Sequence, residues 1–212
     1  MQVPTVTALQ LQKHNKERVN LFLDGEYAFA ISLTAAMGLR KGQALSPAQV
    51  AELRDEGESN LAYHQALRYL GMRPRSEQEV VTYLRRKGYD DQLIEAVTSK
   101  LGEQGYVDDE AFARFWVENR NRFRPRSKRA LAYELRQKGV DREDIDSALA
   151  PQDDEAAAWD AVQPKLERWA GLPQEEFKQK LLGFLARRGF SYGVGRAVYE
   201  RAWDQLSDEP DA

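Results

Sequence analysis

The sequence predicts a mainly α-helical protein. It predicts three tandem three-helix repeats that form an elongated, curved array, preceded by a small antiparallel β-sheet. Two observations lead to this prediction. A segment in the first half of the chain recurs 51 residues later without a gap, and chance rarely produces such a register. Before the repeats, apolar residues alternate at period two, which is typical of a half-buried strand.

Residues 4–32 are predicted to form a three-stranded antiparallel meander. Val19, Leu21 and Leu23 are the apolar members of an alternating run. The residues that alternate with them are Arg18, Asn20 and Phe22. Asp24–Gly25 is a strong signal for a two-residue hairpin. Because so small a sheet is marginally stable alone, we expect helices to cover it.

Two short helices are predicted after the strands, near residues 33–38 and 46–56. Ser46 and Pro47 suit the N-cap and first positions of the second helix. Residues 57–60 (Gly-Glu-Ser-Asn) are interpreted as a linker, and the pattern beyond them is helical. The predicted divisions are residues 1–57 for the N-terminal region, 61–107, 108–150 and 153–206 for the repeats, and 207–212 for an acidic tail.

The middle helix of each of the first two repeats starts at a serine and ends at a glycine. The serine suits an N-cap, and the glycine suits the left-handed position that ends a helix. A leucine four residues before the glycine is predicted to lie in the core. The matching pairs are Ser76 and Ser127, Leu84 and Leu135, and Gly88 and Gly139.

The third repeat matches the pattern of the first two less closely, but it can still be recognised. Leu185–Gly189 (Leu-Ala-Arg-Arg-Gly) matches the ends of the two earlier middle helices. Pro164 lies inside the first helix of this repeat, where proline ends or kinks a helix.

Basic residues are concentrated in the second repeat. The whole chain has a formal net charge of −3, but residues 112–138 contain nine Lys/Arg against two acids, a net +7 that leaves −10 for the rest. Such asymmetry indicates one face that contacts an anionic partner. The predicted contact residues are Arg120, Arg122, Phe123, Arg124, Arg126, Lys128, Arg129, Arg136 and Lys138. Secondary candidates are Arg73, Arg75, Arg85, Arg86, Lys87, Arg187 and Arg188.

The basic run also has an ordinary interpretation, since most charge runs are solvated helix faces and Glu118 or Glu134 could pair with some of its members. Two features favour a contact: few acids lie nearby in the sequence, and Pro125 is expected to hold Arg122–Arg126 in an outward loop. Phe123, between arginines, is the candidate for stacking on bases. By contrast, Phe112, Phe115 and Trp116 have helical spacing and are expected in the core.

The search for catalytic, cofactor and metal motifs finds none. The sequence contains no phosphate-binding glycine loop and no zinc-protease motif. Its two histidines are His14, in a predicted turn, and His64, in a predicted helix. There is no cysteine and no apolar run long enough for a membrane span. We therefore expect a cytoplasmic, monomeric protein that is neither an enzyme nor cofactor-dependent.

The repeats resemble the RecX family, regulators of the RecA recombinase. Five stretches of the sequence carry the resemblance. They are Arg73–Ser76, Leu84–Tyr89, Gly105–Ala113, Leu135–Gly139 and Phe184–Phe190. The similarity runs from about Leu61 to Trp203, some two thirds of the chain.

This resemblance implies three repeats of three helices each, and binding in the groove of RecA filaments on single-stranded DNA. It also implies inhibition of RecA ATP hydrolysis and strand exchange, and hence restraint of the SOS response. The alternative is a sequence-neutral DNA-binding module that acts without RecA, for which binding to bare DNA should depend steeply on salt. Whether such a protein caps filament ends or lies along them is open.

Overall fold

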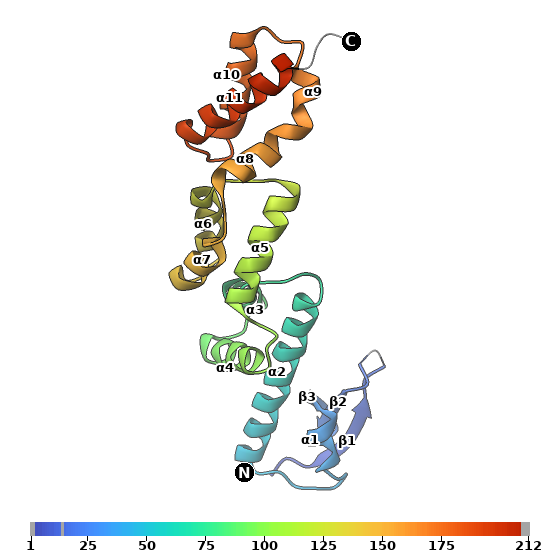
Figure 1. Ribbon diagram of the computed structural model, residues 1–212. Helices are drawn as coiled ribbons and strands as arrows, with labels where there is room; N and C mark the ends of the chain where they lie inside the picture. Colours follow the sequence, from blue (N-terminus) through green and yellow to red (C-terminus); the bar gives the residue numbers. More distant parts are fainter. Residues whose placement is uncertain (1–2, 14, 209–212) are drawn as a thin grey trace. The chain divides into compact units, whose positions relative to one another are not determined.

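The computed structural model (Figure 1) describes residues 3–13 and 15–208, so the turn predicted at His14 lies outside the described residues. The chain divides into two compact units. One contains the residues up to Arg73 together with Val80–Tyr106, and the other contains Pro74–Glu79 together with the residues from Val107 onward. The elongated, curved form of the array stays a prediction.

The N-terminal meander is confirmed. Strands β1 (Val6–Leu11), β2 (Arg18–Leu23) and β3 (Glu26–Ser32) form one antiparallel sheet in that order. Asp24 and Gly25 have φ values of 52° and 92°, the left-handed pair that a tight hairpin requires. Buried apolar residues of the sheet pack toward the helices that follow it.

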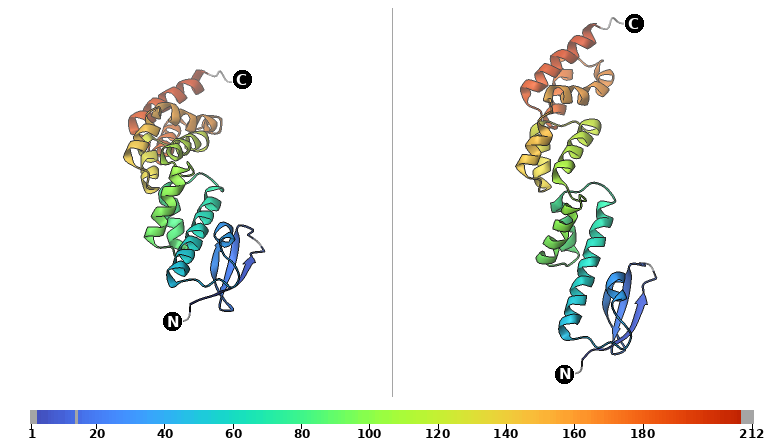
Figure 2. Two further views of the ribbon diagram at one scale, coloured as in Figure 1. Left: turned by 90° about the horizontal axis from the view of Figure 1, so that it is seen from below. Right: turned by 60° about the horizontal axis from the view of Figure 1, so that its bottom comes forward.

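Helix α2 (Pro47–Leu70) shows that the linker predicted at residues 57–60 is wrong. After α1 (Leu33–Met37), α2 runs without interruption through those residues and lies beside the sheet (Figure 1; Figure 2). Its start is as predicted, because Ser46 and Gln49 form a capping box at the N-terminus. The glycine that suggested a break serves packing instead.

Helix α2 and strand β3 lie close together at Gly57. A Cβ atom at Gly57 would fall well inside van der Waals contact of the Ala30 carbonyl oxygen. Arg18, predicted to alternate outward, is only 6% exposed at this junction. Its guanidinium donates to the carbonyl oxygens of Ala30 at 2.9 Å and Gly57 at 3.3 Å, which satisfies the buried charge.

The remaining elements are helical. They are α3 (Glu77–Arg86), α4 (Asp91–Glu103), α5 (Asp109–Phe123), α6 (Lys128–Gln137), α7 (Arg142–Leu149), α8 (Asp154–Val162), the 3₁₀ turn η1 (Gln163–Lys165), α9 (Leu166–Trp169), α10 (Gln174–Ala186) and α11 (Tyr192–Asp208). Pro164 interrupts the first helix of the third repeat, as predicted. Helix α11 extends through Ser207, so the predicted tail begins too early; residues 209–212 lie outside the described residues.

The predicted core positions are confirmed for the leucines. Leu84 and Leu135 are both 0% exposed, and Leu185 is 1% exposed. Phe112 is buried and Trp116 is half-buried, but Phe115 is 39% exposed and the prediction for it is wrong. The buried face of α5 runs from Phe112 through Ala113 to Val117, and helical spacing places Phe115 on the other side of Phe112, at the edge of that face.

A repeated joint connects consecutive repeats through serine hydroxyl groups. Ser76 Oγ donates to the Lys138 carbonyl oxygen at 2.6 Å, and Ser127 Oγ donates to the Gly189 carbonyl oxygen at 2.7 Å. Each hydroxyl also accepts a backbone N–H in the first turn of its own helix, from Glu79 at 3.3 Å in α3. The N-cap of one middle helix therefore satisfies an end carbonyl of the next.

An aspartate completes each joint. Asp109 Oδ1 accepts the Glu77 N–H at 2.8 Å, and Asp154 Oδ1 accepts the Lys128 N–H at 2.7 Å. The acceptor helices end at glycines whose φ values are positive, which side chains rarely tolerate. At Gly189 an added Cβ would also lie 2.7 Å from Ser127 Oγ. Glycine is therefore favoured at these positions for two reasons: the backbone is left-handed, and a side chain would collide with the neighbouring repeat.

Replacing Gly57 with alanine should destabilise the fold. The new methyl group meets backbone that has to shift, so we expect a loss of about 1–3 kcal/mol in the free energy of unfolding. Gly193→Ala is the control, because Gly193 is exposed in α11 and its Cβ would meet only Ser191 Oγ, at 3.9 Å. That change should be neutral or stabilising in urea unfolding. Equal losses in the two variants would contradict the packing role.

Ser127→Ala should cost more than Ser191→Ala. Both serines accept a backbone N–H at 3.2 Å in the first turn of a helix, from Ala130 and from Val194. Ser127 alone of the two donates across a joint, to Gly189. Loss of a cap costs about 1 kcal/mol, and loss of the part-buried hydrogen bond to Gly189 adds about 0.5–1.5 kcal/mol. Urea unfolding measures both; equal costs would mean that the joint adds nothing.

Asp109→Asn should stabilise the protein near neutral pH. Burial chiefly raises the pKa of Asp109 from 3.8; the Glu77 N–H lowers it, and the nearby acids Glu77, Asp144 and Asp141 raise it. Because the folded pKa is raised, this group's contribution to stability falls as pH rises from 3.8 through the folded pKa. Asparagine keeps the acceptor oxygen without the charge, whereas alanine loses both.

The difference between Asp109→Asn and the unmodified protein should therefore be largest near neutral pH and shrink on acidification toward 3.8. Asp109→Ala is expected to be destabilising at every pH because the Glu77 N–H loses its acceptor. Free energies of unfolding across this range measure both effects. A pH-independent difference for the asparagine variant would contradict the assignment.

Candidate functional site

The basic segment spans the end of α5, a short loop and the start of α6. The prediction that Arg122–Arg126 forms a loop is partly wrong, because α5 continues through Arg122 to Phe123. Arg124 is its C-cap, Pro125 is buried, and Ser127 caps α6. The loop is thus confined to the few residues between the two caps, and α5 itself presents Arg122 and Phe123.

Glu134 neutralises two of the predicted contact residues. Its carboxylate accepts from Arg120 Nε at 2.7 Å and pairs with Arg126 Nη1 at 3.0 Å. The indole N–H of Trp116 donates to the same carboxylate at 2.8 Å, and Glu134 is 15% exposed. For Arg120 and Arg126 the ordinary interpretation holds, because the fold brings α6 back against α5 and Glu134 pairs with both. Arg120 and Arg126 serve the packing of these helices.

Lys138 is also held inside the protein. Its ammonium group lies 2.9 Å from Glu79 Oε1 and 4.5 Å from the centre of the Trp116 ring. The side chain is 19% exposed. Lys138 thus supports the joint between the first two repeats, close to the hydrogen bond that its own carbonyl accepts from Ser76. We leave Arg120, Arg126 and Lys138 out of the candidate contact surface.

The other members of the predicted set are exposed. They are Arg122, Phe123, Arg124, Lys128, Arg129 and Arg136. Within the described part of the chain none of these five cations has an ion pair. Phe123 is 66% exposed, and the Arg122 guanidinium lies 5.3 Å from its ring centre. An exposed aromatic ring among unpaired arginines is a suitable surface for bases and phosphates.

Helix α6 adds an aromatic residue that the sequence analysis missed. Tyr133 is 62% exposed and lies on the same helical stripe as Arg129 and Arg136, at spacings of four and three residues. The opposite stripe carries the buried Leu131 and Leu135. The spacing of Tyr133 from the two arginines was the signal that could have identified it. We call Arg122, Phe123, Arg124, Lys128, Arg129, Tyr133 and Arg136 the basic surface.

The secondary candidates have different surroundings. Arg85 pairs with Asp91 at 2.7 Å, and Lys87 lies 5.6 Å from the centre of the Tyr83 ring. Arg86 is exposed at the end of α3. Arg73 and Arg75 precede α3 and are both engaged in contacts. Arg187 is exposed at the end of α10, and the structure brings only its neighbour Arg188 to the basic surface.

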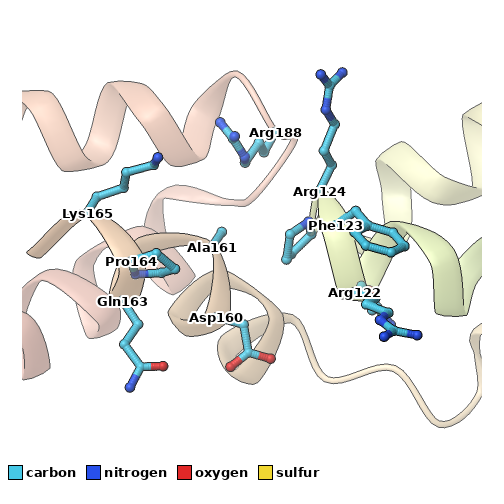
Figure 3. A pocket seen from close by; sticks show the side chains of 11 residues that line it. Arg122, Phe123, Arg124, Asp160, Ala161, Gln163, Pro164, Lys165 and Arg188 are labelled. Carbon is cyan, nitrogen blue, oxygen red and sulfur yellow. The ribbon is translucent and has the colours of Figure 1, made fainter.

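Arg188 helps to line a pocket of about 570 Å³ between the second and third repeats (Figure 3). One wall is formed by Asn121–Pro125 and the other by Asp160, Ala161 and Gln163–Lys165. Burial lowers the pKa of Arg188, and its cationic neighbours Arg126, Arg187 and Arg124 lower it further. The guanidinium lies 3.7 Å from the centre of the Phe184 ring, which fixes its position.

The described residues contain no cluster of histidine, aspartate and glutamate side chains arranged to hold a metal ion. No helix among them is both long and apolar enough to cross a membrane.

Comparison with known proteins identifies four segments of the chain. Residues 4–46 match the N-terminal domain of regulatory protein RecX. The first, second and third three-helix domains of RecX match residues 62–101, 108–149 and 153–199. The organisation into three three-helix domains after a small sheet, predicted from the internal repeat, is confirmed.

The relatives include regulatory protein RecX of Bacillus licheniformis, 34% identical over 203 residues that cover 93% of this chain and 77% of the relative. The RecX of Thermobifida fusca is 43% identical over 146 residues, 68% of this chain and 77% of the relative. A crystal structure of regulatory protein RecX matches with a TM-score of 0.71 at 27% identity, covering 93% of this chain and all of the other. The RecX structure from Lactobacillus salivarius, at 20% identity and a TM-score of 0.60, covers 68% of this chain and 96% of its own and supports the fold alone.

Proposed function

The chain belongs to the RecX family of regulatory proteins, and from that premise we propose that it binds RecA filaments on single-stranded DNA. Bound there, it inhibits RecA ATP hydrolysis and strand exchange. It thereby restrains homologous recombination, DNA repair and the SOS response. It acts in the cytoplasm as a monomer, and as a regulator rather than an enzyme.

The observation that carries this proposal is the basic surface. Its cations are exposed and lack carboxylate partners among the described residues, although the chain as a whole is acidic. Glu134 and Glu79 neutralise the basic residues that stabilise the fold and leave the outward ones unpaired. A positive surface on an acidic protein directs association with an anionic partner and opposes contact elsewhere. A nucleoprotein filament is such a partner.

The second candidate is a sequence-neutral DNA-binding module that acts without RecA. The exposed rings of Phe123 and Tyr133 favour it, because aromatic side chains beside cations bind single strands without reading sequence. The two functions differ in the form of DNA that the protein must bind. The module binds bare DNA under the conditions in which it acts, whereas the regulator acts on DNA covered by RecA.

Removing four exposed cations should weaken inhibition while leaving the fold intact. The sequence alone selects Arg122, Arg124, Arg126 and Arg129; because Arg126 pairs with Glu134, Arg136 replaces it. Exposed cations contribute little to stability, so the melting temperature of the quadruple alanine variant should be nearly unchanged. Its inhibition of RecA ATPase on single-stranded DNA should weaken most at low salt, because screening already weakens the unmodified protein at high salt.

The matched control is the quadruple alanine variant at Lys13, Lys16, Arg40 and Lys41, four exposed basic residues of the N-terminal unit. It removes the same charge and should inhibit normally. Unfolding of the first variant would make its cations structural. Normal inhibition by that variant would place the contact elsewhere, and equal weakening by both variants would reduce the effect to net charge.

A further inference from the structure

The pocket between the second and third repeats combines the features of a site for one nucleotide. It belongs to a single compact unit, and its volume of about 570 Å³ lies within the range of small-molecule sites. We infer that this pocket binds one nucleotide unit of single-stranded DNA, with the phosphate held by Arg124, Lys165 and Arg188 and the base stacked on Phe123. The inference rests on the proposed function only for the source of the strand.

The phosphate side is defined by three cations from different elements. Arg124 follows α5, Lys165 ends η1 and Arg188 follows α10. In Figure 3 their side chains lie on one side of the pocket, while Arg122 and Asp160 lie on the other. None of the three has an ion pair among the described residues. The one acidic lining residue is therefore displaced from the place where an anion would bind.

Mutual repulsion makes these cations receptive to an anion. Arg188 is half-buried, and its cationic neighbours include Arg124 and Arg187, which have no ion pair among the described residues. A group of like charges in a partly dehydrated recess is stabilised when a phosphate enters it, and arginine binds phosphate through two parallel hydrogen bonds. Stacking on Phe184 already fixes the Arg188 guanidinium, so little side-chain freedom is lost on binding.

The base side is defined by Phe123, which stands at the rim beside Arg124 (Figure 3). Its ring is 66% exposed although it belongs to the last turn of a helix that buries other aromatic residues. A nucleotide uses both the ring and the cations, whereas an acidic peptide would use the cations alone. This difference favours nucleic acid over a carboxylate-rich protein segment as the ligand.

The test uses the full-length protein and a fluorescein-labelled oligothymidylate in the absence of RecA, read by fluorescence anisotropy. A strand of the same length without bases is the second probe. Phe123→Ala should weaken binding to oligothymidylate by about fivefold or more, the lower limit for loss of one stacked base. The same variant should bind the abasic strand as the unmodified protein does. Phe123→Tyr should restore the preference for bases.

Lys165→Gln should instead weaken binding to both strands and change the salt dependence. Removal of one phosphate contact on a single strand lowers the slope of log K against log salt by about 0.7. The control is Lys180→Gln, an exposed lysine of α10 that does not line the pocket, and its slope should be unchanged. A residue with only a structural role would not move this slope selectively.

Three results would overturn the inference: no binding of oligothymidylate at low salt, an equal effect of Phe123→Ala on both strands, or an unchanged slope for Lys165→Gln. Displacement of the strand by polyglutamate without any effect of Phe123→Ala would assign the pocket to an acidic protein partner instead. Because RecA is absent, these outcomes are separate from the proposed function. If neither variant changed strand binding as expected while inhibition of RecA ATPase stayed intact, only the pocket assignment would be rejected. If the variants changed strand binding as expected but the unmodified protein did not inhibit RecA ATPase, only the RecA function would be rejected.

Discussion

The serine hydroxyl that joins two repeats is the interaction on which the helical part of this protein depends. Ser76 and Ser127 each cap their own helix and donate to the terminal carbonyl of a helix in the next repeat. A unit of three short helices has little core of its own, so contacts with neighbours are a necessary part of its stability. The joint also packs closely. Each acceptor helix is followed by a glycine, Gly139 or Gly189, at which an added Cβ would collide with the preceding repeat.

The joint also positions the basic surface. It fixes α6 through hydrogen bonds at both ends, since Lys138 follows the helix and Ser127 precedes it. With α6 held, Glu134 reaches Arg120 and Arg126, and Arg129 and Arg136 remain on the exposed stripe of α6. The same serine places the end of α10, and with it Arg188, beside the loop that follows α5. The basic surface and the joint therefore use adjacent residues: Ser127 stabilises the joint, whereas its neighbours Lys128 and Arg129 are exposed for the proposed binding.

Much of the fold was predictable because its signals are local. Serine caps, terminal glycines and the two-residue hairpin each act within a few residues, and the structure has them where they were expected. Gly57 was misread because a glycine that breaks a helix and one that permits close packing look alike until the partner strand is known. The sequence left open whether Glu118 or Glu134 pairs with the basic run, and it did not indicate that Lys165 lines the pocket. Both depend on tertiary contacts, which residue spacing does not reveal.

The placement of the joint has a consequence for how such a chain can evolve. Ser76 and Ser127 occupy the same position within their repeats, and each donates to an acceptor 62 residues further along the chain. Gene duplication of one repeat would therefore deliver a donor and an acceptor that already fit a neighbour, without any further mutation. After such a duplication, the donor and acceptor positions can change only together. A bulkier residue at Gly189 would be tolerated only with a compensating change around Ser127 and Ala130.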